Sequence, residues 1–355
     1  MREYTNIRHK QNAQFRLPYM DRIITRPVPA CILCGTAGKI REAQVFDPDG
    51  AIPDPWSYRQ CGNGDCGLVW LDPAPLETEL WKAYTSYHTH TKTRQNKLSK
   101  ALLSLLNRLV RLLFFPIWLV NGLLRETRQM RLLMLGNDPA GKLLDVGCGG
   151  GRYLHRMQRR GWNVEGIDFD AQATQRVTER YGIKTYTGDL LAAGLPEASF
   201  DAITMSHTIE HLVDPAATLN ECLRLLKPGG KLIVVTPNVN SNAAALFGPF
   251  WRGWEPPRHL HLFSVSTLKR ILSEAGFAVQ DAYASAAASA IIYRVSATNQ
   301  RKHAGTNSLL FQFGLVLWSY YHELRDFKAQ KQELPVAQNL VAIAVKPNCR
   351  NLPAN

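Results

Sequence analysis

"KLLDVGCGGGRYLHRMQRRG", residues 142–161, predicts a strand, a glycine-rich turn and a helix in direct succession. The apolar start is typical of a buried strand, and Gly147, Gly149 and Gly151 follow it at once. Glycines at such a turn let the backbone approach a ligand closely, and the next helix points its first N–H groups toward that ligand. The stretch therefore predicts a ligand crevice at the carboxyl end of this strand.

Strand-like and helix-like segments alternate on the carboxyl side of this stretch. One helix is predicted over 214–230, with Asp214 as its N-cap and Gly229 at its end, and another begins at Ser264 or Ser266. The alternation predicts a doubly wound α/β fold, in which helices flank a mainly parallel sheet of seven strands. The other predicted strands cover residues 163–170, 184–190, 200–207, 231–238, 277–284 and 339–347.

The remainder of the chain divides by composition. At 355 residues, the chain is long enough for one large domain and a small one. About fifty residues separate the last two predicted strands, and we expect a helical insertion there, at about 286–338. From the N-terminus, the predicted regions are a mobile polar arm at 1–25, a cysteine-rich module at 26–87, a basic and apolar helical linker at 88–135, the α/β domain at 136–347 and a tail at 348–355.

Four cysteines of this module form two pairs, each followed by glycine: Cys31 with Cys34, and Cys61 with Cys66. The N-terminus has no apolar signal-peptide core, so we expect a reducing, cytoplasmic location in which a disulfide framework does not form. Two thiolate pairs at this spacing are typical of a structural, tetrahedral Zn²⁺ site. We expect the core of the module to be separate from the core of the α/β sheet.

Acidic residues stand at the ends of successive predicted strands. Asp168 ends the second strand about twenty residues after the glycine turn, where a carboxylate can accept hydrogen bonds from both ribose hydroxyls. Asp189 ends the third strand, where it can accept a hydrogen bond from an exocyclic amine. Because ligands bind at the carboxyl ends of parallel strands, the turn and the acids together predict a nucleotide-type cofactor.

Taken together, "LLDVGCGGG", "GIDFD", "GDL", "SHTIEHLVDP" and "LLKPGGKLIVVTPN" resemble the successive motifs of class I S-adenosylmethionine-dependent methyltransferases. The chain is most similar to the ubiquinone-type O-methyltransferases and to the sugar methyltransferases of bacterial polysaccharide biosynthesis. The cysteine-rich module resembles the zinc-ribbon leader of many members of that bacterial group. The resemblance covers about 140–285 and the last strand, and it implies a Rossmann-like sheet.

The resemblance also implies a role for each matching residue. The first acid and the turn glycines would hold the methionine part of S-adenosylmethionine. The acid that ends the second strand would hold the ribose, with the next aromatic ring near the adenine. The acid that ends the third strand would bind the adenine amine, with a leucine beside it, and a serine would lie under the cofactor. These residues are Asp145, Gly147, Gly149, Gly151, Asp168, Phe169, Asp189, Leu190 and Ser206.

A titratable cluster follows the fourth strand: His207, Glu210 and His211, with His259 in a later "PRHLHLF" segment. The end of this strand faces the crevice, so the cluster is predicted to lie beside the methyl donor and the acceptor. Three interpretations are open. His207 or His259 is a general base, or all four residues bind a divalent metal that acidifies a hydroxyl. In the third, Glu210 and His211 only tie this turn to the later segment.

The segment 247–263 is rich in aromatic residues and contains Arg252 and Arg258. It is a candidate wall of the acceptor site, because aromatic rings stack on sugar or quinone rings and arginine suits a phosphate. The alternative is a packed lid. Tyr84 and Tyr87 are candidates to fold over the site from the cysteine-rich module.

The net charge of +13 suggests an anionic partner, and residues 92–131 carry nine Lys or Arg against one acid. Arg108, Arg111 and Pro116 interrupt the apolar run in this region, which favours an amphipathic surface helix over a membrane span. Together with the apolar run at 309–324, this helix is expected either to contact the anionic inner face of a membrane or to pack on the α/β domain. No recognised nucleic-acid-binding module is present, so nucleic acid is not the expected partner.

The expected function is O-methylation of a small-molecule acceptor, namely a sugar, a glycan or a lipid-linked intermediate. Methylation of a quinone or an isoprenoid phenol is the alternative enzymatic function. A non-catalytic cofactor-binding regulatory or scaffold protein is the third possibility, and the intact glycine turn and acids argue against it. The sequence pattern fixes neither the acceptor nor the oligomeric state.

Overall fold

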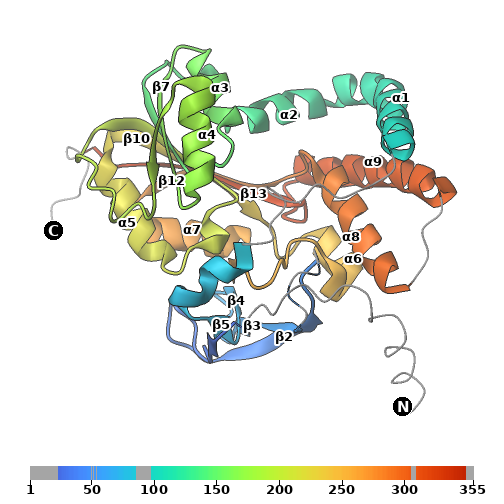
Figure 1. The fold of residues 1–355 in the computed structure, drawn as a ribbon, viewed down its shortest axis with the longest axis horizontal. Helices are drawn as coiled ribbons and strands as arrows, with labels where there is room; N and C mark the ends of the chain where they lie inside the picture. Colours follow the sequence, from blue (N-terminus) through green and yellow to red (C-terminus); the bar gives the residue numbers. More distant parts are fainter. Residues whose placement is uncertain are drawn as a thin grey trace.

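The computed structural model describes residues 23–48, 50, 52, 54–84, 97–304 and 309–348. Figure 1 shows a central α/β unit, with the cysteine-rich module below it and a group of long helices to its right. Residues 1–22 of the predicted arm at 1–25, Tyr87, and residues 349–355 of the predicted tail lie outside the described residues, so the statements about them stay predictions. An arm that extends to residue 25 is wrong, because Thr25 pairs with Pro75 in a short strand.

A seven-stranded sheet forms the centre of the α/β unit, with the strand order β12-β13-β10-β9-β6-β7-β8. Neighbouring strands from β10 to β8 are parallel, whereas β13 pairs antiparallel with both β10 and β12. This sheet confirms the predicted doubly wound, Rossmann-like α/β class. Its strands are β6 (Lys142–Val146), β7 (Asn163–Asp168), β8 (Lys184–Thr187), β9 (Phe200–Ser206), β10 (Leu226–Pro237), β12 (Ala278–Ser285) and β13 (Asn339–Val345).

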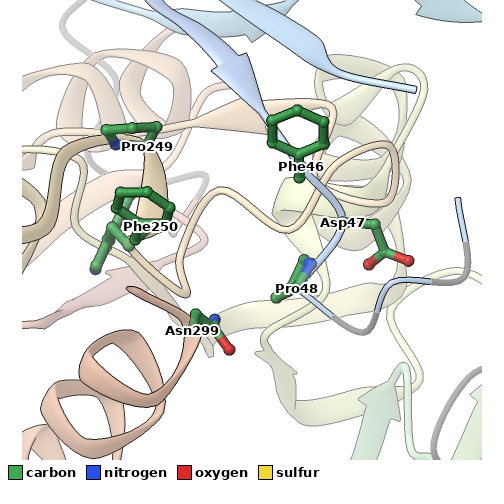
Figure 2. A pocket seen from close by; sticks show the side chains of 7 residues that line it. Phe46, Asp47, Pro48, Pro249, Phe250 and Asn299 are labelled. Atoms are coloured by element: carbon green, nitrogen blue, oxygen red, sulfur yellow. The ribbon is translucent and has the colours of Figure 1, made fainter. Parts of the chain in front are cut away.

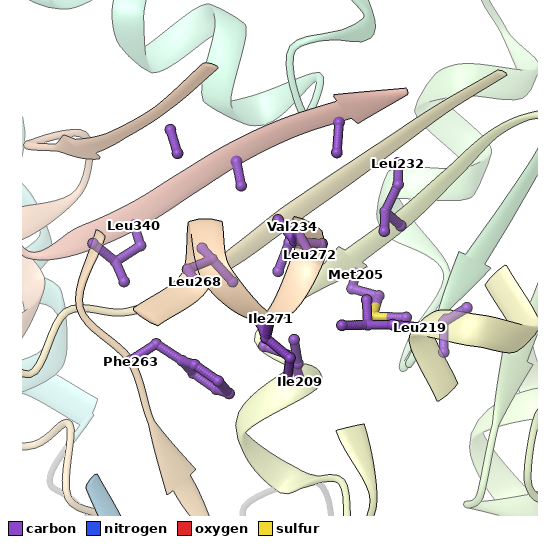
Figure 3. Packing of buried hydrophobic residues seen from close by; sticks show 14 of the residues in the cluster. Met205, Ile209, Leu219, Leu232, Val234, Phe263, Leu268, Ile271, Leu272 and Leu340 are labelled. Carbon is purple, nitrogen blue, oxygen red and sulfur yellow. The ribbon is translucent and has the colours of Figure 1, made fainter. Parts of the chain in front are cut away.

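Two hydrophobic cores lie on the two faces of this sheet, because side chains alternate along each strand. Leu232 and Val234 of β10 belong to the core that includes α5 and α7, and Ile233 and Val235 belong to the core with α3 and α4. Figure 3 shows the first core, where each buried aliphatic side chain contributes about 1.5–3 kcal/mol by leaving water. The helices are α3 (Arg152–Gln158), α4 (Ala171–Tyr181), α5 (Pro215–Leu225) and α7 (Val265–Glu274).

The helix starts agree with the sequence more closely than one helix end does. Asp214 caps α5 by accepting a hydrogen bond from the N–H of Ala217, as predicted. Ser264, rather than Ser266, caps α7. The helix α5 stops at Leu225, four residues before the predicted end at Gly229, because Leu226 already pairs with Phe200 in the sheet.

The cysteine-rich module is a four-stranded antiparallel sheet with the order β11-β4-β3-β2. Its fourth strand, β11 (His261–Leu262), comes from the α/β domain. Buried Leu68 and Trp70 of the module join the same core as Phe263 and Leu268. The prediction of a separate module core is therefore wrong, since the two parts share a sheet and a core. The other strands are β2 (Gly38–Val45), β3 (Trp56–Cys61) and β4 (Val69–Leu71), and β1 (Thr25–Arg26) pairs with β5 (Ala74–Pro75).

Long helices form the predicted linker and insertion. The helix α1 (Lys97–Asn121) packs against α9 (Leu309–Lys331), and α8 (Ser289–Ala304) precedes α9. Among the described residues, no helix combines the length and hydropathy needed to cross a bilayer. The remaining helical elements are α2 (Leu123–Arg131), α6 (Asn242–Phe247), η1 (Glu77–Tyr84), η2 (Leu135–Asn137), η3 (Ile209–His211) and η4 (Gly248–Phe250).

Candidate active site

The predicted glycine turn follows β6 and leads into α3. Gly147, Gly149 and Gly151 have φ values of 79°, 49° and 67°, a backbone region that favours glycine. A Cβ on Gly147 would collide with the Thr208 hydroxyl, whereas nothing lies within 4 Å of the Cβ position of Gly149. The turn is closed toward the post-β9 segment and open where a ligand would approach, which fits the implied cofactor.

Two acids stand beside the turn, and one of them, Asp168, holds it in place. Asp168, at the end of β7, accepts hydrogen bonds from the N–H groups of Gly149 at 2.8 Å and Asp170 at 3.0 Å. Asp145 is buried in β6 and accepts a hydrogen bond from the Thr204 hydroxyl at 2.7 Å. Burial raises the pKa of Asp145 to about 7 and also raises the pKa of Asp168. A cationic ligand beside the turn would offset this effect, because a nearby positive charge favours the ionised carboxylate.

The other predicted cofactor residues stand at neighbouring strand ends. Phe169 follows β7 and is 59% exposed, and Ser206 ends β9. After β8, Leu190 is buried, and the exposed Asp189 accepts a hydrogen bond from the N–H of Leu191 at 3.1 Å. The predicted residues therefore share the carboxyl edge of the sheet, and their contacts with the cofactor stay a prediction.

His207 and Glu210 form a hydrogen-bonded pair just after β9. Burial of Glu210 favours its neutral form, but the hydrogen bond and charge of His207 outweigh burial and lower the pKa of Glu210 to about 2. The second Glu210 oxygen accepts a hydrogen bond from the Thr236 hydroxyl at 2.8 Å. Because an ionised carboxylate only accepts, the Nδ1 of His207, 3.3 Å from Glu210 Oε1, carries a proton. The Nε2 of the neutral His207 ring is therefore free to accept one.

Two further features distinguish His207. Its φ of 55° lies in the left-handed region, a strained conformation that concentrates at functional sites. Partial loss of hydration lowers the pKa of His207, but the hydrogen bond and charge of Glu210 outweigh this and leave the pKa above its usual value. A half-exposed histidine oriented by a buried carboxylate is the arrangement of a general base.

Backbone carbonyl groups hold the two other histidines of the cluster. The Nδ1 of His211 lies 3.1 Å from the carbonyl oxygen of Arg258, and the Nδ1 of His259 lies 2.7 Å from that of Gly253. Burial lowers the pKa of His259 to about 4, which makes it a weak proton acceptor at neutral pH. These contacts favour a structural role for His211 and His259, distinct from the role of His207.

The metal interpretation involves a smaller set than expected. Glu210, His211 and His259 each place one ligand atom within 4.8 Å of the others, and His207 is not in this set. Both oxygens of Glu210 already accept hydrogen bonds, from His207 and Thr236. Among the described residues, this cluster thus offers three potential metal ligands, Glu210, His211 and His259.

The cysteine-rich module reaches the site through Tyr84, as the sequence suggested. Tyr84 ends η1, and its ring packs edge-on against Phe169 with a centroid separation of 4.7 Å. Its hydroxyl lies 3.1 Å from the Nδ1 of His211. Tyr84 therefore links the module to both the expected adenine contact and the histidine cluster.

Arg258 fastens the module to the 247–263 segment. Its side chain is 1% exposed and donates to the carbonyl oxygen of Ala83 at 3.1 Å. It also pairs with Asp47 of the module and with Glu255, and Arg252 pairs with Glu255 at 2.7 Å. The expectation that Arg258 suits a phosphate is therefore wrong, because its guanidinium is buried among these partners. Sequence reasoning missed Asp47 and Glu255, since neither belongs to a recognisable motif.

A pocket lies where the module meets the 247–263 segment and α8 (Figure 2). None of the predicted catalytic or cofactor residues lines it, so it is separate from the crevice at the carboxyl edge of the sheet. Its lining residues are Phe46, Asp47, Pro48, Pro249, Phe250, Trp251 and Asn299.

The four module cysteines converge on one point. The sulfur atoms of Cys31 and Cys66 lie 3.6 Å apart, and those of Cys34 and Cys61 lie 3.4 Å apart. All four sulfurs lie within 4.8 Å of one another. Four sulfurs at about 2.3 Å from a tetrahedral Zn²⁺ would be separated by about 3.8 Å, so the donor set fits a zinc ion.

Comparison with known proteins supports the methyltransferase interpretation. Residues 121–282 match a family model described as a methyltransferase domain. A ubiquinone biosynthesis O-methyltransferase of Paracidovorax citrulli is 39% identical over 114 residues, which cover 30% of this chain and 47% of that protein. The protein of the same name from Pseudomonas fluorescens is 34% identical over 154 residues, which cover 39% of this chain and 66% of that protein.

The chain spans about half the length of the first of these relatives. A crystal structure of a SAM-dependent methyltransferase from Archaeoglobus fulgidus is 19% identical, with a TM-score of 0.42, and covers 63% of this chain and 93% of that one. The matched residues contain the glycine turn, the strand-end acids and the five parallel strands β6 to β10, whereas β13 lies outside the match. Residues 121–282 therefore form a methyltransferase domain similar to that of the S-adenosylmethionine-dependent O-methyltransferases.

Proposed function

We propose that this protein transfers a methyl group from S-adenosylmethionine to a hydroxyl oxygen of a small-molecule acceptor, with His207 as the general base. The observation that carries this proposal is the His207–Glu210 pair at the end of β9. The pair lies next to the glycine turn, because Thr208 is the residue that closes one side of Gly147. A base at this place would face both the methyl donor and the acceptor.

Different residues of the chain have different roles in the proposed methyl transfer. Bound S-adenosylmethionine would supply an electrophilic methyl group on a positively charged sulfur, which would keep the electron pair of the broken carbon–sulfur bond and leave as a neutral thioether. The Nε2 of His207 takes the hydroxyl proton as the acceptor oxygen attacks, and Glu210 stabilises the imidazolium that forms. The proton then leaves His207 for water, which restores the base. The glycine turn and Asp168 hold the donor in place, which matters because an in-line transfer depends on positioning.

A phenolic hydroxyl on a quinone-type ring is the acceptor that we propose. The two curated relatives are named for ubiquinone biosynthesis, which supports this class. A phenol has a pKa near 10, so a histidine base can assist its ionisation more readily than that of an aliphatic alcohol. The sugar, glycan or lipid-linked acceptor expected from the sequence gains no support from these relatives and is the alternative in the same assay.

We also propose that Cys31, Cys34, Cys61 and Cys66 bind one structural Zn²⁺. The support is their convergence and the left-handed glycines, Gly35 and Gly67, that follow one cysteine of each pair. Four thiolates complete a tetrahedral shell, so this ion would hold the module together and leave no open position for catalysis.

Methyl transfer to a panel of acceptors tests the proposed function. The panel contains a prenylated catechol, its unprenylated parent and a polyprenyl-phosphate-linked sugar, and we expect turnover of the catechols. His207→Asn should lower kcat/KM by about 10²–10⁴ with little change in S-adenosylmethionine affinity. The wild-type rate should rise with pH through the raised pKa of His207, and this dependence should vanish in the variant.

His259→Asn serves as the matched control, because His259 is buried and held by the backbone. We expect it to lower the melting temperature while the pH dependence of the remaining activity persists. Loss of turnover on chelation, with the cysteine-bound zinc retained, would favour the metal interpretation instead. Full activity of His207→Asn at an unchanged melting temperature would refute the general-base role.

A further inference from the structure

Helix α1 is apolar on two opposite faces. One face packs on α9, where the rings of Phe114 and Trp118 have centroids 5.8 Å and 5.1 Å from that of Tyr320. Val110, one turn earlier, is buried on the same side. The opposite face is exposed, although surface helices normally carry polar side chains there. Its exposed residues are Leu105, Leu109, Leu112, Leu113, Leu119 and Val120.

This exposed face is continuous rather than a scatter of single side chains. It extends over residues 105–120, about 24 Å at 1.5 Å per residue. Leu112 is 70% exposed and Val120 is 85% exposed, so no described residue covers them. Contiguous apolar surface of this kind marks an interaction site in a folded protein.

The charged residues in the sequences of α1 and α2 are mostly basic. The sequence of α1 contains Lys97, Lys100, Arg108 and Arg111 and no acidic residue. The following helix, α2, adds three arginines and one acid, Glu126. The carboxylate of Glu126 already accepts a hydrogen bond within the protein, from the Ser285 hydroxyl at 2.6 Å. An occupant of the face should therefore be both apolar and negatively charged.

We propose that the exposed face of α1 docks on an anionic lipid bilayer, with the helix in the plane of the headgroups. Its leucines would enter the boundary between headgroups and acyl chains, and its lysines and arginines would attract anionic headgroups. A second copy of the chain is a poorer occupant, because a two-fold contact through this face would bring the same basic residues together.

Vesicle co-sedimentation of the full chain tests this proposal. The probes are vesicles of phosphatidylcholine alone and vesicles that also contain phosphatidylglycerol. We expect binding only to the second kind, and we expect 0.5 M salt to weaken it, because salt screens headgroup attraction. The double variant Leu112→Gln/Val120→Gln should weaken this binding at least tenfold. Arg108→Gln should weaken it about fivefold, which corresponds to about 1 kcal/mol per charge.

The matched control is Leu246→Gln/Leu334→Gln, which removes two exposed leucines from other elements. It should bind vesicles as the unaltered chain does. Equal binding to both vesicle types, or binding that the Leu112 and Val120 changes leave intact, would overturn the proposal. It would also be overturned if light scattering showed a dimer that the same double variant dissociates, because the face would then join two copies.

Discussion

Replacing Arg258 with Met tests whether the cysteine-rich module and the methyltransferase domain fold as one unit. Methionine keeps much of the side-chain volume but removes the charge and the donors. Arg258 is the cation between Asp47 and Glu255, whose side chains are 0% and 7% exposed. Breaking a buried ion pair by removing one partner costs about 3–5 kcal/mol. We therefore expect the free energy of unfolding to fall by about that amount.

Equilibrium urea unfolding measures this change. The control is Arg270→Met, which removes an exposed i,i+4 pair with Glu274 and should change the midpoint little, because solvent screens that pair. The double variant Arg258→Met/Asp47→Asn should be more stable than the sum of the single changes predicts. The difference should be about 1–3 kcal/mol, since removing both charges leaves neither buried alone.

The same variant should also weaken cofactor binding. Arg258 holds the Ala83 carbonyl, and the next residue, Tyr84, packs on Phe169. Calorimetry with S-adenosylmethionine should therefore show lower affinity in the folded variant. If Arg258→Met lowered the free energy of unfolding by less than about 1 kcal/mol, and the two changes were additive in the double variant, the module and the domain would not depend on this ion pair.

Three other predictions concern the cofactor, the zinc site and pH. Asp168→Ala should weaken S-adenosylmethionine binding by about 1–3 kcal/mol in calorimetry, because the hydrogen bonds of its carboxylate are lost. If the unaltered protein bound a nicotinamide dinucleotide in preference to S-adenosylmethionine, the methyltransferase interpretation would be contradicted. Purified protein should contain about one Zn²⁺ by metal analysis, and Cys34→Ser should lose it and lower the melting temperature of the whole chain, since module and domain share a core. Burial lowers the pKa of His259 and His261 to about 4, so each should reduce stability as the pH drops from about 6.5 toward 4, because the unfolded chain takes up their protons first, whereas the raised pKa of Asp145 acts in the opposite direction. Thermal unfolding of the unaltered chain and of His261→Asn across that range measures the contribution of the histidine, and identical pH profiles for the two would contradict its buried neutral state.

The α/β core was predictable because its signals are local. Glycine punctuation, the Asp214 and Ser264 caps and apolar runs of strand length each act within a few residues, and the structure confirms them. Strand β11 could not be predicted, because two residues of an ordinary loop become a strand only through pairing with β4.

The histidine cluster shows a second limit of the sequence. The sequence does not show which of its three histidines is catalytic. Their burial and their hydrogen-bond partners, which only the structure shows, give them different roles. A carboxylate orients His207, whereas carbonyl groups hold His211 and His259. The Arg258–Asp47 pair was invisible for a related reason, since its partners are 211 positions apart and share no pattern.

The shared sheet has a consequence for synthesis on the ribosome. Strand β4 is made about 190 residues before β11, the strand that pairs with its free edge. At about 5–20 residues per second, the edge of β4 waits about 10–40 s for that partner. During this time the nascent module presents unpaired backbone groups and an uncovered Trp70, the features that holding chaperones recognise and that promote aggregation. Slow synthesis of the intervening residues would lengthen this exposure, so yield in a cell should depend on translation speed even where the finished protein is stable.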